Sequence, residues 1–123
     1  MELNDYQEKA MTTCMPSSNN YAYMMLNLVG EVGEFASKVA KSIRKENVII
    51  NDNALVYNEF PTCIEQDEEL MKEAGDILWQ LSGLCKVMGW NLERIAQMNL
   101  DKLAARKQAG TIDGSGDGII RGK

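Results

Sequence analysis

Two pairs of acidic residues stand at helical spacing in separate stretches of the chain. Glu31 and Glu34 lie in NLVGEVGEFASKVAKSI, and Glu73 and Asp76 lie in LMKEAGDILWQLSGLCKVM. Residues three apart occupy neighbouring positions on one helix face, so each pair can direct two carboxylates to the same side. Carboxylate oxygens are the ligands that Mg²⁺ and Mn²⁺ prefer, and Mg²⁺ usually shares them with waters and substrate phosphates. The four acids are therefore candidate metal ligands.

The residues alone leave two interpretations of these pairs open. An acidic pair at the edge of an apolar stripe is often only a solvated surface, here with Glu34 and Lys38 as an i,i+4 ion pair. The pair on the later stretch favours a site, because its face becomes apolar within about two turns, at Leu84 and Val87. Unpaired carboxylates facing a partner helix would each cost several kcal/mol, and a divalent cation removes that cost.

Composition restricts the chemistry further. The 123 residues include no histidine, which excludes imidazole bases, Ser-His-Asp or Cys-His catalysis and His-ligated zinc. A formal net charge of −5 argues against a nucleic-acid polymer as partner. No apolar run approaches the roughly 18 residues of a membrane span, and the polar N-terminus does not resemble a signal peptide. Three cysteines without a CxxC pair favour reduced thiols in a cytoplasmic protein.

Four helices are expected to position the acidic residues. Apolar residues recur at helical spacing over residues 3–14, 20–46, 66–89 and 92–108. Gly89 and Gly110 are expected to end the last two helices. The stretch 47–65 combines Asn, Asp and Pro with short apolar runs, so we expect an irregular connection there, with a small hairpin as the weaker alternative. The sequence predicts an all-α, four-helix bundle-like domain over 1–110 and a Gly-rich, irregular C-terminal tail over 111–123.

The predicted fourth helix carries a polar residue within its apolar face. Asn99 falls near the middle of a stripe formed by Leu92, Ile95, Ala96 and Leu103. An amide in an apolar stripe needs hydrogen-bond partners, which can be a neighbouring backbone or a substrate. Lys102 and Arg106 follow on the same helix and can bind anionic oxygens. Lys38, one turn after Glu34, is a further candidate for holding phosphates.

Four segments of the chain together resemble a known family. YQEKAMTT, GEVGEFASKVAK, KEAGDILWQLSGL and NLDKLAARKQAGTIDGSGD are similar to the MazG-like nucleoside triphosphate pyrophosphohydrolases of the all-α NTP pyrophosphatase superfamily. The resemblance covers nearly the whole chain apart from 47–65 and the last few residues. It implies an enzyme that cleaves a (deoxy)nucleoside triphosphate between the α- and β-phosphates, giving a nucleoside monophosphate and pyrophosphate. It further implies Mg²⁺ bound by Glu31, Glu34, Glu73 and Asp76.

The same resemblance assigns roles on the last helix. Asn99 and Lys102 match the family's N-x-x-K segment, which implies nucleotide contact, and Arg106 fits a basic position there. Many members carry Glu directly before the first Glu of ExxE, where this chain has Gly30. A dedicated extra carboxylate is therefore missing, and the number of metals and the general base stay open.

An oligomer is also expected. The family resemblance implies a homodimer or homotetramer with sites near the subunit interfaces. The two long helices carry apolar residues beyond one face, including Met24 and Trp79, which is more than a lone four-helix domain of this size should bury.

Two other classes of function compete with the hydrolase. One is a carboxylate metal-binding helical bundle without activity; the di-iron bundles of this kind use Glu-x-x-His, which this chain lacks. The other is a small all-α adaptor whose acidic faces bind a basic partner, which leaves Asn99 and Lys102 without a role.

Overall fold

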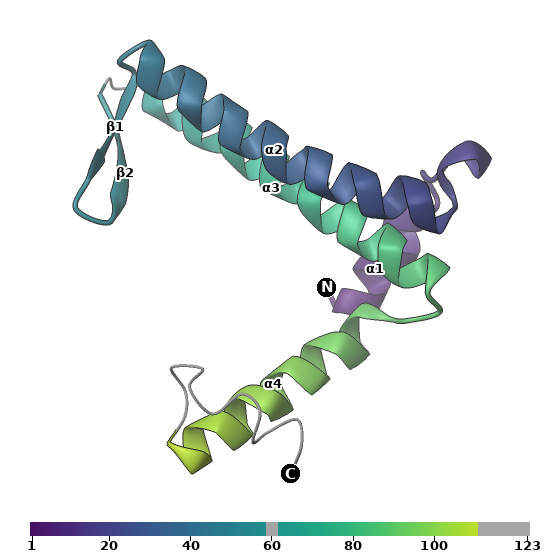
Figure 1. The fold of residues 1–123 in the computed structure, drawn as a ribbon. Coiled ribbons are helices and arrows are strands. Elements are labelled where there is room, and N and C mark those ends of the chain that lie inside the picture. Colours follow the sequence, from purple (N-terminus) through teal and green to yellow (C-terminus); the bar gives the residue numbers. More distant parts are fainter. Residues whose placement is uncertain (59–61, 111–123) are drawn as a thin grey trace.

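The computed structural model of this chain describes residues 1–58 and 62–110. The predicted tail at 111–123 lies outside the described residues. Within the described ranges the chain is mostly helical, which confirms the all-α class (Figure 1). No helix there is both long and apolar enough to cross a membrane. The helices are α1 (Leu3–Met11), a short 3₁₀ turn (Pro16–Ser18), α2 (Tyr21–Arg44), α3 (Thr62–Val87) and α4 (Leu92–Ala109).

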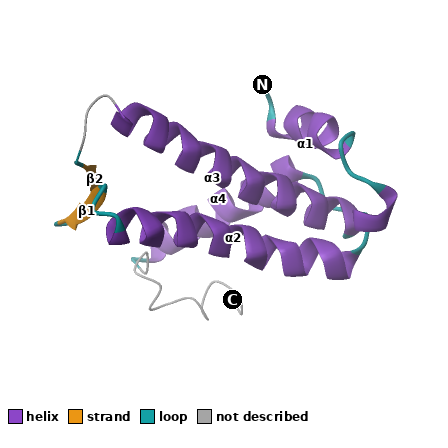
Figure 2. Cartoon of the chain, turned by 90° about the horizontal axis from the view of Figure 1, so that it is seen from above, coloured by secondary structure: helices purple, strands orange, loops and turns teal. Residues whose placement is uncertain are grey.

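The long helices α2 and α3 form an antiparallel pair and lie side by side along most of their length (Figures 1 and 2). Asn20 starts α2, because its side chain accepts a hydrogen bond from the Tyr23 N–H at 2.8 Å. Met24 is fully buried against Gly83 of α3, where any side chain would collide with the Met24 thioether. Glycine at this position therefore permits the close approach of the two helices.

Polar bonds hold α1 against the end of this pair. The buried Gln7 donates to the carbonyls of Ser82 and Trp90 at 3.3 and 3.1 Å, and accepts from the Leu92 N–H at 3.0 Å. The Trp79 indole N–H donates to the Ala10 carbonyl at 3.1 Å. One short helix thus joins the end of α3 to the beginning of α4, and all of these buried polar groups find partners.

The expectation of an irregular connection at 47–65 is wrong for most of that stretch. Strands β1 (Val48–Asn51) and β2 (Ala54–Tyr57) pair in an antiparallel hairpin, and α3 begins at Thr62. Asp52 has a φ of 53° in the turn, a conformation that Asp and Asn tolerate better than most residues. The hairpin that was the weaker alternative is therefore present, and its strands of four residues are too short to show a clear period of two in the sequence.

Helix α4 leaves the other helices after its first turns. Asn91 caps its start by accepting from the Arg94 N–H at 2.8 Å, and Gly110, with a φ of 73°, ends it as predicted. Its main packing is against α1, and it extends away from the α2–α3 pair (Figure 1). Helix α4, which carries Asn99, Lys102 and Arg106, therefore does not lie along the α2–α3 pair of its own chain.

Candidate metal centre and substrate site

Three of the four predicted acids meet between α2 and α3. Glu31 of α2 and Glu73 and Asp76 of α3 each place a carboxylate oxygen so that all three lie within 4.8 Å of one another. Glu31 is half-buried, the Glu73 side chain is 13% exposed and Asp76 is exposed. The i,i+3 spacing on α3 and the antiparallel packing of α2 bring the three carboxylates together. Because Asp76 is exposed, the group is open to solvent on one side.

The charges in this carboxylate group act on one another. Burial raises the pKa of the Glu31 carboxyl, and the nearby charges of Asp76, Glu73 and Glu34 raise it further. Without a cation, the charged carboxylates therefore repel one another, and burial deprives them of part of their hydration. A divalent cation would relieve both effects, and an all-oxygen donor set suits Mg²⁺ or Mn²⁺. The residues present thus fit the metal that the sequence analysis expects.

Glu34 stands apart from the group of three. It is exposed, and it lies near enough for its charge to act on Glu31. Its place three residues after Glu31 turns it about 60° around α2, toward the solvent. The structure thus gives Glu34 a different environment from the other three predicted ligands.

Lys38 binds the opposite helix instead of forming the predicted pair with Glu34. Its Nζ lies 2.9 Å from Glu73 Oε1 and 3.8 Å from Glu69 Oε2. The hydrogen bond that Lys38 donates to Glu73, followed by the charge of the same carboxylate, raises the pKa of Lys38. The described residues show no Glu34–Lys38 ion pair, so the interpretation of this edge as a simple solvated pair is wrong for Lys38.

Tyr6 of α1 is a neighbour of the site that sequence reasoning missed. Burial raises the pKa of its hydroxyl, and the charge of Asp76 raises it further, so the phenol lies within electrostatic reach of Asp76. The signal for it was the segment YQEKAMTT, which contributed to the resemblance without any role for its tyrosine. A phenol close to a carboxylate can donate a hydrogen bond to it or to a bound phosphate.

Three of the four predicted substrate residues, all except Lys38, lie on α4. Asn99 and Lys102 are exposed and Arg106 is half-buried. The stripe around Asn99 is covered only at its beginning, because Leu92 is buried whereas Leu103 is 37% exposed. The structure therefore does not bring these residues to the carboxylate group within one chain.

The chain is similar to known proteins over most of its length. The family model of the MazG nucleotide pyrophosphohydrolase domain matches residues 19–111, which include α2, α3 and α4. The chain is 34% identical over 125 residues to the Gene 37 protein of Mycobacterium phage L5, covering 95% of this chain and 98% of the phage protein. No solved structure matches the chain significantly. With a matching domain over most of its length and both acidic pairs inside that domain, the chain belongs to the MazG nucleotide pyrophosphohydrolase family.

Proposed function

We propose that this protein hydrolyses (deoxy)nucleoside triphosphates between the α- and β-phosphates, releasing a nucleoside monophosphate and pyrophosphate. The observation that carries the proposal is the group of Glu31, Glu73 and Asp76, with one oxygen from each within 4.8 Å of the others, in a chain of the MazG family. Mg²⁺, with Mn²⁺ as a substitute, is the cation that such oxygens select. When bound, it supplies charge neutralisation for the phosphates and a lowered pKa for water.

The residues of the chain divide this work. Glu31, Glu73 and Asp76 bind the cation, since their oxygens converge. Lys38 lies 2.9 Å from Glu73, and with Glu73 serving as a metal ligand its ammonium group would bind a phosphate oxygen of the substrate. Glu34 lies at the solvent side of the same turn and accepts the proton from the attacking water. It thereby takes the place of the glutamate that many family members carry where this chain has Gly30.

The remaining predicted residues bind the substrate from α4. Asn99 donates to the nucleotide, and Lys102 and Arg106 attract its phosphate oxygens. Because α4 extends away from its own α2–α3 pair, we assign these contacts to the site of a second copy (Figure 1). The working enzyme is then a homodimer, or a homotetramer built from such dimers.

An exposed apolar stripe on α2 supports this association. Val29 and Val32 are 65% and 50% exposed, and they share one helix face with Met25, Ala36 and Ile43, all exposed. Met24, which the sequence suggested as an excess apolar residue, does not support association, because its side chain is fully buried within the chain. An uncovered apolar stripe of this kind favours packing against a helix of a second copy. Separately, we propose a cytoplasmic location from the cysteines alone.

Three measurements test the reaction and the assembly. Each nucleoside triphosphate is incubated with and without Mg²⁺, and the products are identified by ³¹P NMR. We expect monophosphate and pyrophosphate only with the cation; diphosphate and phosphate would contradict the proposed cleavage. Hydrolysis in ¹⁸O-water shows which phosphorus atom the water attacks. Sedimentation at micromolar concentration should show a dimer or tetramer, and only a 13.7 kDa species would overturn the assembly.

The non-catalytic metal-binding bundle is the alternative with a specific observation behind it, because the carboxylate group alone accounts for metal binding. It predicts that Mg²⁺ raises the melting temperature while no triphosphate is hydrolysed. An adaptor predicts neither effect.

A further inference from the structure

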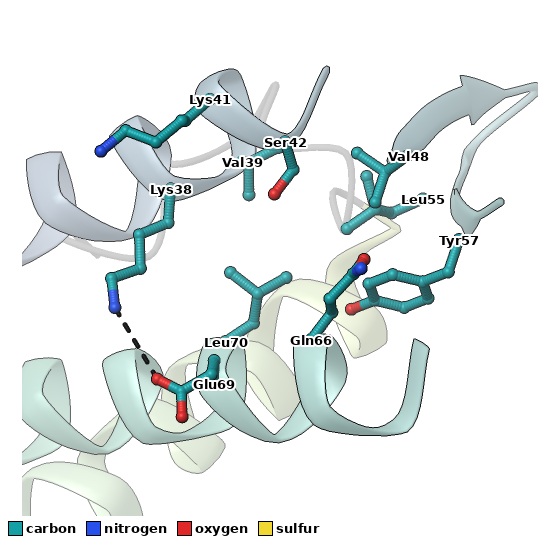
Figure 3. A pocket seen from close by; sticks show the side chains of 10 residues that line it. All are labelled: Lys38, Val39, Lys41, Ser42, Val48, Leu55, Tyr57, Gln66, Glu69 and Leu70. Atoms are coloured by element: carbon teal, nitrogen blue, oxygen red, sulfur yellow. Dashed lines mark ion pairs between the residues drawn. The ribbon is translucent and has the colours of Figure 1, made fainter. Parts of the chain in front are cut away.

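A cavity lies beside the carboxylate group, between α2, α3 and the hairpin. Its volume is about 320 Å³, at the lower end of the range for small-molecule sites. Val48, Leu55 and Leu70 line its middle, and Figure 3 shows the first two converging from the hairpin and Leu70 from α3. Lys38 stands at one end, and Tyr57 and Gln66 stand at the other (Figure 3). The cavity is therefore apolar along its walls and polar at its ends.

Gln66 gives this cavity a specific chemical demand. Its Oε1 atom is buried and has no hydrogen-bond partner among the described residues. Leaving a buried acceptor without a donor costs free energy, so such an atom calls for an explanation. The carboxamide rises from α3 toward the hairpin, beside the ring of Tyr57 (Figure 3). The Tyr57 hydroxyl donates to Asp67 at 3.0 Å, which fixes that ring in place.

The cavity and the carboxylate group are joined by one residue. Lys38 lines the cavity and also contacts Glu73 of the group. Gln66 and Glu73 lie seven residues apart on α3, which corresponds to two helical turns or about 10 Å along the axis. In any nucleotide the sugar separates the base from the α-phosphate. A phosphate held beside Lys38 would therefore leave its base further along α3, toward Gln66.

We propose that this cavity is the nucleobase subsite of the enzyme and that Gln66 selects bases carrying an exocyclic amino group. The inference rests on the proposed hydrolysis of nucleoside triphosphates and names the part of the substrate that the hairpin recognises. A flat base places its apolar faces against Val48, Leu55 and Leu70 and its polar edge at Gln66. The hairpin is thus a specificity element, since it supplies one wall of the subsite.

The preference for an amino group follows from the carboxamide. Adenine and cytosine present an amino donor next to a ring-nitrogen acceptor, which matches the Oε1 and Nε2 atoms of one glutamine. Hypoxanthine and uracil present a carbonyl at the place of the amino group. That oxygen would face Gln66 Oε1, and pairing would require the carboxamide to turn over from the orientation in the structure, with Nε2 in place of the buried Oε1.

The test compares substrates that differ only at this position. For the wild-type protein with Mg²⁺, we expect kcat/KM to be about tenfold higher for dCTP than for dUTP and for dATP than for dITP. Gln66→Leu should bring both ratios close to one while retaining Mg²⁺-dependent hydrolysis. Glu68→Leu is the matched control, because Glu68 is exposed on the same helix and does not line the cavity. It should keep the wild-type ratios.

Three kinetic results would overturn the proposal. They are equal rates within both substrate pairs in the wild type, preserved ratios in Gln66→Leu, and a uniform loss for every substrate in Gln66→Leu. The last result would assign Gln66 a structural role.

A binding measurement separates this inference from the hydrolase proposal. The side-chain amide resonance of Gln66 is assigned in ¹⁵N NMR spectra by its absence in Gln66→Leu. Titration with CMP should shift it, whereas ribose 5-phosphate should not, and the buried amide of Gln7 serves as the internal control. Shifts with CMP but no hydrolysis of any triphosphate would reject the reaction and keep the base site. Hydrolysis without a shift at Gln66 would reject the base site alone.

Discussion

The α2–α3 pair and α4 both carry predicted site residues, yet the structure treats them differently. The pair packs along its length and converges Glu31, Glu73 and Asp76. Helix α4 packs mainly on α1, and Asn99 and Lys102 are exposed on it. Intrachain packing therefore completes the metal-binding half of the proposed site and leaves the substrate-binding half open. In the proposed enzyme, one chain therefore preforms the carboxylate group, whereas the contacts from α4 come from a second chain.

The largest expected effect is loss of the preformed half. Glu31→Gln and Glu73→Gln should each lower Mg²⁺-dependent kcat/KM at least about 100-fold, because each removes an anionic ligand. Steady-state assays over a range of Mg²⁺ concentrations measure this effect. Glu68→Gln, an exposed change on α3, is the control and should retain normal turnover. Normal turnover in Glu31→Gln would show that the carboxylate group is not the metal site.

A smaller effect is expected on α4. Asn99→Ala should raise KM for nucleoside triphosphates about tenfold, because a lost hydrogen bond to a substrate costs on the order of 1 kcal/mol or more. The stabilisation of the protein by Mg²⁺ alone should not change, since α4 is remote from the carboxylate group in the same chain. Kinetics and metal-dependent melting curves measure the two quantities. If the variant is largely unfolded and its remaining folded fraction has a normal KM, Asn99 has a structural role.

Mixing two defective chains tests whether the halves combine across an interface. Glu31→Gln and an Asn99→Ala, Lys102→Ala double variant are refolded together in equal amounts. In a twofold dimer, half of the molecules would be mixed and one of their two sites would be intact, which restores about a quarter of wild-type activity. Activity no higher than the mean of the separate variants would place both halves of the site in one chain.

The smallest effect concerns the stability of the metal-free protein. In EDTA, Glu31→Gln should melt at a higher temperature than the wild type, because it removes a charge whose pKa is raised by burial and by neighbouring acids. Above its raised folded-state pKa, the Glu31 carboxylate opposes folding. That penalty declines as the pH falls through the folded-state pKa, so the advantage of the variant should shrink at lower pH.

Glu73→Gln sharpens the same melting experiment. Repulsion among the carboxylates by itself favours equal or greater metal-free stability for both variants. The structure gives Glu73 an ion pair with Lys38 at 2.9 Å, so its replacement loses an attraction as well as a repulsion. We therefore expect Glu73→Gln to melt below Glu31→Gln in EDTA. Equal melting temperatures would mean that the Lys38 contact contributes nothing to stability.

Much of the local structure was predictable from the residues. The period of apolar residues located the helices, and α2 extends over Tyr21–Arg44 where 20–46 was predicted. Gly110 ends α4 with the positive φ that glycine adopts without strain. The hairpin was only the weaker alternative from sequence, because its strands pair over four residues each and pairing depends on contacts between two segments.

The sequence by itself determined the helices, the two acidic pairs and the oxygen-based chemistry, because spacing along a helix fixes which side chains share a face. Only the tertiary structure decided which of these residues meet. It joined three acids across α2 and α3, turned Lys38 to Glu73, buried Met24 and directed α4 away from the pair. Such choices depend on how helices pack against one another, and helical periodicity carries no information about the partner of a face.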